Sequence, residues 1–544
     1  SSDVCSSDLI PYTPPSIFFC CRFVPYRISD RVMNGDLFKI TLISVIAILL
    51  AIVGGLVSAD GDPVSIALAI APFALAALYM MKEKVWYLWI LIPPLFIPFS
   101  INSYAPLFAY SVVLPFYLWN VMLRRSSLTW NSIPLLDTLI FLLFIHVAYV
   151  FLTHPFGLGI NILEDYYGGK GYIMFLQALL AYVCLSSLKT NSQDLGKVLQ
   201  WSIALILFFT LVQTARALLS PESGEGMEGS AGGGTNGDTR NSSFLAFSVL
   251  VLQVLILKYS AWQMIKRPWW GLLAVSACAG ILISGFRSSL AVILLLFFIV
   301  SLLYKRWFVS IVAPILGLGI LMLFSSSKTL LELPFGVQRV LSVLPFLEVS
   351  SQAREDAMAS IQWRVEMWAW AFDDREKFIQ DKVFGDGFAR DINILKANIY
   401  KEAYHLTNSN QISFAWNGLW HSGPVSTIQT IGYVGLTLYS IISVIGMVYA
   451  WQVGRIYRYN KYSLGILFVA AIYFTRPLSF FFIFGDSTYI TADIISLGII
   501  KILFCCAKRE GLYISIHMRR EYVPLMIQQK EEKPGLPSSS GIPC

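Results

Sequence analysis

Long runs of apolar residues recur along most of this chain, separated by shorter polar stretches. A helix needs about 20 apolar residues to cross a hydrocarbon core of about 30 Å, and many of these runs approach that length. Residues 291–303 are apolar at almost every position, whereas a strand of a transmembrane barrel alternates apolar and polar positions. The pattern therefore predicts an all-α polytopic membrane protein.

We expect about fourteen membrane spans, with their boundaries at the ends of the apolar runs. The expected spans are residues 40–58, 64–81, 85–99, 104–123, 135–152, 172–188, 201–219, 243–257, 271–283, 288–303, 308–324, 425–451, 463–484 and 488–503.

Basic residues between these spans favour one orientation, with the amino terminus in the cytoplasm. The inside connections would hold Lys82, Lys84, Arg124, Arg125, Lys189, Lys197, Lys258, Lys266, Arg267, Lys305, Arg306, Arg455, Arg458 and Lys461. The outside connections would hold Lys170, Arg240 and Arg287. Because Lys and Arg concentrate in cytoplasmic loops, we expect the connections that hold Lys170, Arg240 and Arg287 to face the extracytoplasmic side.

The polar segments divide the chain further. Residues 1–9 (SSDVCSSDL) read like a translated adapter, so we expect residues 1–32 to be an artefactual or disordered amino-terminal segment. Residues 33–324 would hold the first eleven spans, 325–424 a large extracytoplasmic cap loop, 425–503 the last three spans and 504–544 a cytoplasmic tail.

Composition agrees with a membrane location. Of the 544 residues, 56% are hydrophobic and 13% are charged, far from the quarter typical of soluble domains. The net charge of +7 comes largely from clusters beside the apolar runs, so no nucleic-acid partner is expected. No cluster with metal-ligand spacing and no phosphate-binding glycine motif occurs, so we expect neither a metal nor a cofactor.

The cap loop contains one stretch with helical spacing of apolar residues. Ile361, Val365, Trp368 and Phe372 recur at intervals of three or four. Two alternatives are open: this amphipathic helix lies on the bilayer surface, or it packs against the ends of the spans.

Two cations stand at the outer face against the charge rule. Arg287 follows a very short turn, Ser284–Gly285–Phe286, and opens the next apolar run. Its guanidinium offers a fork for phosphate oxygens, although an arginine at a helix end also extends to the interface without any such role. Arg240 ends a glycine-rich loop, and together the two cations could flank one diphosphate.

Three further residues are candidates. His421 precedes the span 425–451 at the membrane rim, where an imidazole is suited to accept a proton from a hydroxyl; it could equally belong to an aromatic belt beside Trp420. His146 lies mid-span and is expected to bond a neighbouring helix. Arg476 lies deep in its span before Pro477, which we expect to break the helix, and Asp486 or Asp493 would be its partner.

The order of these features resembles the O-antigen ligase and polymerase family. The shared marks are an arginine-bearing turn (GFRSSLAVILLLFF), one large outside loop, a WRVEMWAWA segment followed by VFGDGF, and HSGPVSTIQTIGYVGL leading into a span. The resemblance covers roughly residues 240–438. It implies a GT-C-like fold in a bacterial inner membrane, with the working face periplasmic. Arg364 matches a recurrent arginine of the family.

By this resemblance the substrate is a glycan on an undecaprenyl diphosphate carrier embedded in membrane lipid. The glycan would pass to a hydroxyl of an acceptor glycolipid or glycan, with His421 as general base and with Arg287 and Arg240 on the diphosphate. Attack opposite the leaving group would invert the anomeric centre, without metal or nucleotide.

Two other functions stay open from the sequence. A polymerase of the same family shares the chemistry and differs only in the acceptor. A glycolipid flippase or other transporter would also suit many spans, although such proteins often show two similar halves with interrupted helices.

Overall fold

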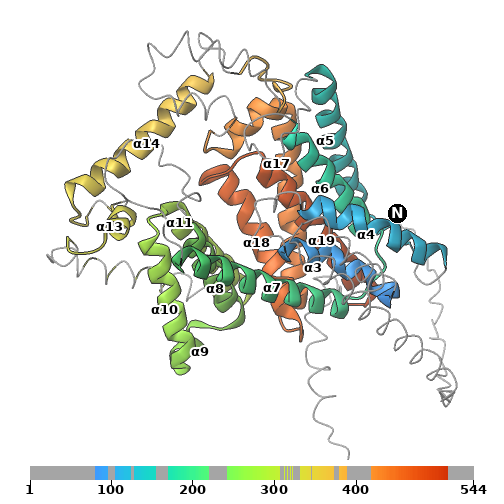
Figure 1. Ribbon diagram of the computed structural model, residues 1–544, viewed down its shortest axis with the longest axis horizontal. Coiled ribbons are helices and arrows are strands. Elements are labelled where there is room, and N and C mark those ends of the chain that lie inside the picture. Colours follow the sequence, from blue (N-terminus) through green and yellow to red (C-terminus); the bar gives the residue numbers. More distant parts are fainter. Residues whose placement is uncertain are drawn as a thin grey trace, which may run out of the picture. The chain divides into compact units, whose positions relative to one another are not determined.

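The computed structural model describes residues 80–95, 105–123, 128–154, 169–219, 242–306, 331–342, 346–372, 379–388 and 420–512, with the single positions 312, 315, 319, 322, 344 and 418. It divides the chain into two units, Ser1–Met81 and Lys82–Cys544, and the elements below belong to the second. Figure 1 labels its helices. Within the described ranges the regular structure is helical, and one isolated bridge joins Leu128 to Leu188. The all-α prediction is confirmed for these residues.

Five described helices are long and apolar enough to cross a membrane. They are α5 (Pro134–Thr153), α7 (Ser192–Leu219, apolar over Ser192–Arg216), α17 (Gly423–Tyr457), α18 (Ser463–Phe482) and α19 (Thr488–Arg509). Five more helices are apolar but shorter: α4 (Ala105–Met122), α6 (Lys170–Ser186), α8 (Ser242–Lys258), α10 (Pro268–Ile283) and α11 (Arg287–Leu303). The chain is therefore a helical membrane protein.

The expected count of fourteen spans is not reached in the described ranges. In place of the span 85–99, the structure has a 3₁₀ helix η2 (Lys82–Tyr87) followed by the eight-residue α3 (Leu88–Leu95), which contains Pro93 and Pro94. Consecutive prolines remove backbone donors and clash with the preceding turn, so a straight span is not formed here. The expected span 40–58, almost all of the expected spans 64–81 and 308–324, and the segment 1–32 lie outside the described residues.

The last three helices form the centre of the second unit. α17 packs against α5, α18 and α19, while α18 also contacts α7, α8 and α11, and α19 contacts α6. Gly465 of α18 lies so close to α7 that an added Cβ would be 2.8 Å from the Gln200 amide nitrogen and 3.0 Å from the Gly196 carbonyl oxygen. In a membrane, burial of apolar surface does not drive helices together, because the lipid tails are apolar too. Small residues allow the close van der Waals packing that holds the helices together instead.

Contacts between loops define two ends of this bundle. At one end Glu510 accepts hydrogen bonds from the Ser192 amide and hydroxyl (2.7 and 2.5 Å), and Arg458 donates to the Leu303 carbonyl (3.0 Å). At the other end His421 lies against Phe484, with ring centroids 5.3 Å apart. The first six residues of the expected tail 504–544 continue α19, and residues 513–544 lie outside the described ranges.

The described part of the cap loop contains α13 (Phe335–Leu341), α14 (Ser351–Phe372) and the segment 379–388. The helix predicted from Ile361 to Phe372 is confirmed as part of α14. Its predicted apolar stripe is exposed, with 49% of Ile361 and 56% of Val365 accessible, while Ala353 and Met367 on another face are fully buried. The opposite face packs on the start of α17, because Met367 and Ala371 share a core cluster with Val425 and Ile428, and Trp368 donates from Nε1 to the Trp420 carbonyl (3.1 Å). The helix therefore packs against the end of a span, and most of its predicted stripe faces outward.

Candidate active site

Helix α17 is interrupted at Gly432. This glycine has φ 67° and ψ −176°, a region open almost only to glycine. A break in a helix leaves the carbonyls before it and the amides after it without their usual partners, and each such group costs several kcal/mol in a membrane unless it is paired. The short first half of α17, which directly follows His421 and Ser422, therefore needs partners at its carboxyl end.

The VFGDGF segment of the cap loop supplies most of those partners. The backbone hydrogen bonds are Asp386 N to Gln429 O (2.7 Å), Gly387 N to Thr430 O (3.1 Å), Tyr433 N to Lys382 O (2.9 Å) and Val434 N to Val383 O (3.1 Å). The Asp386 carboxylate accepts the Asp381 amide (2.7 Å) and so shapes the turn. An added Cβ on Gly432 would lie 2.1 Å from the Val383 carbonyl oxygen, so the two segments fit only without a side chain there.

His146 supplies the remaining partner from α5. Its Nε2 lies 2.7 Å from the Ile431 carbonyl oxygen, and because a carbonyl only accepts, Nε2 carries the proton. His146 is 8% exposed. The prediction that His146 bonds a neighbouring helix is confirmed, and the structure adds that the bond caps the half-helix that follows His421.

Arg287 begins α11 and points to α14. The preceding turn uses Gly285 at φ 74°, and α13 packs on it so closely that an added Cβ on Gly336 would be 2.4 Å from the Ile283 carbonyl oxygen. The half-buried Arg287 donates from Nη1 to the Ala357 carbonyl of α14 (3.4 Å). The turn and α13 therefore direct this cation into the cap rather than into solvent.

Arg364 lies on α14 two turns beyond Ala357, close to the same face. Its Nε is buried and makes no hydrogen bond to any residue that the structure describes. Burial, and secondly the charge of Arg339 on α13, lower the pKa of the Arg364 guanidinium. Arg339 itself pairs with Asp356, its Nε 2.5 Å from the carboxylate oxygen. Sequence reasoning missed Arg339, which carries no signal of its own in the chain.

His421 is held between two aromatic rings. Its ring centroid is 5.1 Å from that of Trp363 on α14 and 5.3 Å from that of Phe484. Its φ of 51° lies in the left-handed region, which is strained for residues other than glycine and tends to occur at functional sites. The neighbouring Trp420 is fully buried and donates from Nε1 to Gln429 (2.6 Å), so the backbone leading to His421 is fixed.

The structure thus brings His421, Arg287 and Arg364 to one helix of the cap. Arg287 contacts α14 at Ala357 and His421 contacts it at Trp363, six residues or about 9 Å apart along the helix axis. Arg240 lies outside the described residues. The arrangement combines a half-buried imidazole with two guanidinium groups. The imidazole can accept a proton, and the guanidinium groups can neutralise an anionic leaving group.

Arg476 belongs to a different cluster inside the bundle. Its Nη1 lies 3.2 Å from Asp493 Oδ1 and 3.4 Å from the Ser496 hydroxyl, and Tyr439 donates to Asp493 Oδ2 (2.6 Å). Of the two predicted partners Asp493 is confirmed, and Asp486 instead accepts the Thr488 amide (2.8 Å). The predicted break at Pro477 was wrong: α18 continues through it. These polar bonds join α17, α18 and α19. A structural role therefore explains the position of Arg476.

Among the described residues, no three His, Cys, Asp or Glu side chains gather as metal ligands would. Comparison with protein-family models and with curated proteins finds no match to this chain. What the structure itself defines is a helical membrane protein in which His421 and Arg287 each contact the cap helix α14, which also carries Arg364. Its function is therefore argued from these three residues.

Proposed function

We propose that this chain is a membrane glycosyltransferase of the O-antigen ligase type, acting at the outer face of a bacterial inner membrane. It would move a glycan from an undecaprenyl diphosphate carrier to an acceptor sugar hydroxyl, within an all-α membrane fold of GT-C-like arrangement. The observation that carries the proposal is the contact of both His421 and Arg287 with α14.

The reaction balances with the groups present. The acceptor oxygen attacks the anomeric carbon, its proton passes to the His421 imidazole, and the bond from the anomeric carbon to the diphosphate oxygen breaks. The electron pair leaves with the diphosphate, whose charge Arg287 and Arg364 neutralise through their forked donors. Attack opposite the leaving group inverts the anomeric centre. Arg364 takes the second position in this scheme, with Arg240 as an additional contact.

The break in α17 argues against the transporter alternative. In many transporters the free ends of interrupted helices face the substrate or its coupling ion. In this chain the carbonyls of Gln429, Thr430 and Ile431 are occupied by the cap segment and by His146. The interruption therefore serves to hold the cap loop on the bundle. The polymerase alternative shares the site and differs in its acceptor.

Substitution of His421 tests the proposal directly. His421→Ala is expected to lower glycan transfer about 100-fold or more, because a general base contributes 10²–10⁴-fold, and Arg287→Gln is expected to lower it by a similar factor. The measurement is transfer from the lipid-linked donor in membranes that contain equal amounts of each variant. His154→Ala, a histidine change near the same end of the bundle, is the control and is expected to keep normal transfer.

Normal transfer by His421→Ala would remove the assigned base and with it the mechanism. Deletion of the gene separates the two acceptors. Accumulation of long lipid-linked chains indicates a ligase, accumulation of single repeats indicates a polymerase, and an unchanged glycan pool contradicts both.

A further inference from the structure

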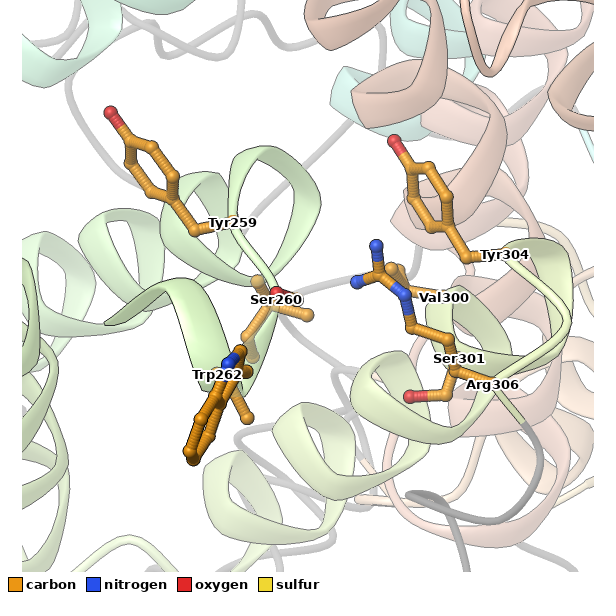
Figure 2. A pocket seen from close by; sticks show the side chains of 9 residues that line it. Tyr259, Ser260, Trp262, Val300, Ser301, Tyr304 and Arg306 are labelled. Carbon is orange, nitrogen blue, oxygen red and sulfur yellow. The ribbon is translucent and has the colours of Figure 1, made fainter. Parts of the chain in front are cut away.

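A second site lies at the opposite end of the bundle from His421. A cavity of about 260 Å³ opens between the α8–α9 connection, where α9 spans Ala261–Lys266, and the carboxyl end of α11. Figure 2 shows its two walls, with the Arg306 guanidinium extending into the space between them. The polar and aromatic side chains that line it are Tyr259, Ser260, Trp262, Ser301, Tyr304 and Arg306.

The backbone at the end of α11 places Arg306 at this cavity. Lys305 adopts φ 57°, and the Arg306 amide donates back to the Ser301 carbonyl (2.7 Å) while the Lys305 amide donates to Leu302 (3.0 Å). This is the turn that usually places glycine at the left-handed position. Lysine at this position strains the backbone locally. The turn places the Arg306 guanidinium over the Tyr304 ring, 4.9 Å from the ring centroid.

The surroundings of the cavity are cationic and aromatic. Lys258 lies over the Tyr259 ring (5.3 Å), and Lys266 over the Trp262 ring (5.3 Å). Aromatic rings and basic side chains at the ends of spans mark the level of lipid headgroups. In the part of the chain that the structure describes, no acidic side chain lines the cavity, so its described lining carries no negative charge.

We propose that this cavity binds the phosphate of an anionic glycerophospholipid headgroup from the adjacent leaflet. The Arg306 fork matches two phosphate oxygens, and the Ser260 hydroxyl, which accepts the Gln263 amide (3.2 Å), still has its own proton to donate. The tyrosine and tryptophan faces cover the glycerol end of the headgroup. The site is independent of the transferase assignment, since it includes none of His421, Arg287 and Arg364.

The test compares lipids that remain bound to the whole protein. The protein is placed in bilayers of equal parts phosphatidylglycerol and phosphatidylcholine and extracted in mild detergent, and the retained lipids are counted by native mass spectrometry. We expect wild-type protein to retain more phosphatidylglycerol than phosphatidylcholine. Arg306→Gln is expected to lower that preference about tenfold or more, because it removes a charge-assisted hydrogen bond to the phosphate.

Two further variants separate the cavity from general charge. Lys461→Gln removes an exposed cation at the same end of the bundle and is expected to leave the preference unchanged. Ala261→Phe fills the cavity, which Ala261 lines, and is expected to lower the preference although every cation remains.

Three results would overturn the proposal: equal retention of both lipids by wild-type protein, equal losses in Arg306→Gln and Lys461→Gln, or displacement of the bound lipid by excess inorganic phosphate, which would indicate a soluble anion as the ligand. Monodisperse elution on size exclusion shows that each variant has folded. None of these results depends on glycan transfer.

Discussion

A lysine without exposed surface lies inside the helix bundle. The Lys501 ammonium of α19 is 2.5 Å from Asp137 Oδ1 on α5 and 2.9 Å from the Ser186 hydroxyl of α6, and its side chain is 0% exposed. Tyr182 donates to the same carboxylate oxygen (2.5 Å). The charges of this pair are therefore satisfied by each other and by two hydroxyl-bearing side chains, which joins three helices at one point.

Removal of one member of this pair is expected to destabilise the protein strongly. Lys501→Met leaves the Asp137 carboxylate buried without its cation and should cost about 3 kcal/mol or more. The double variant Lys501→Met with Asp137→Leu removes both charges and should recover most of that loss. The measurement is the midpoint of thermal unfolding in detergent. Lys197→Met is the control, since it breaks an exposed pair with Asp194 (3.6 Å) and should change stability by less than about 1 kcal/mol.

At the scale of the element, α17 consists of two half-helices that meet at Gly432. The cap segment 382–387 makes backbone hydrogen bonds to both of them. The first half begins directly after His421 and Ser422 and ends at the break, so whatever holds its carboxyl end also fixes His421. Three parts of the chain meet there: α5 through His146, the cap through the VFGDGF segment, and the second half of α17. His146 is therefore expected to act as a positioning residue for His421.

His146→Leu should loosen the first half of α17, because the Ile431 carbonyl loses its donor. His146→Gln keeps an N–H group at a similar reach and should restore it. Hydrogen exchange of peptides covering 382–388 and 428–434 measures this without any substrate, and we expect faster exchange in the leucine variant alone. His154→Leu makes the same change one residue beyond the end of α5. It is the control for the 428–434 peptide, since His154 itself lies beside Gly387 of the other peptide. Unchanged exchange in His146→Leu would show that the cap segment holds the break without α5.

For the whole molecule, the sequence predicted the parts that follow from local pattern. Apolar runs predicted the helical membrane class, helical spacing predicted α14, and a polar residue in a span predicted that His146 reaches another helix. The break in α17 was not predicted, since its cause is a contact with a segment far earlier in the chain. Lys501 falls inside the expected span 488–503, and its pairing with Asp137 was not predicted, because hydropathy does not show which face of a helix meets a carboxylate of another helix.

The arrangement of the two bundle ends predicts the topology. Asn191 and Lys461 lie in the connections at the end that also holds Arg458 and Glu510, whereas Ser487 lies in the connection beside Phe484 and His421. In a background without other cysteines, Ser487→Cys should react with a membrane-impermeant maleimide on intact cells, and Asn191→Cys and Lys461→Cys should react only after permeabilisation. The physical reason is the concentration of Lys and Arg at the Asn191 end, which retains that end in the cytoplasm. The reverse labelling would place His421 in the cytoplasm, where it could not meet a glycan presented at the outer face.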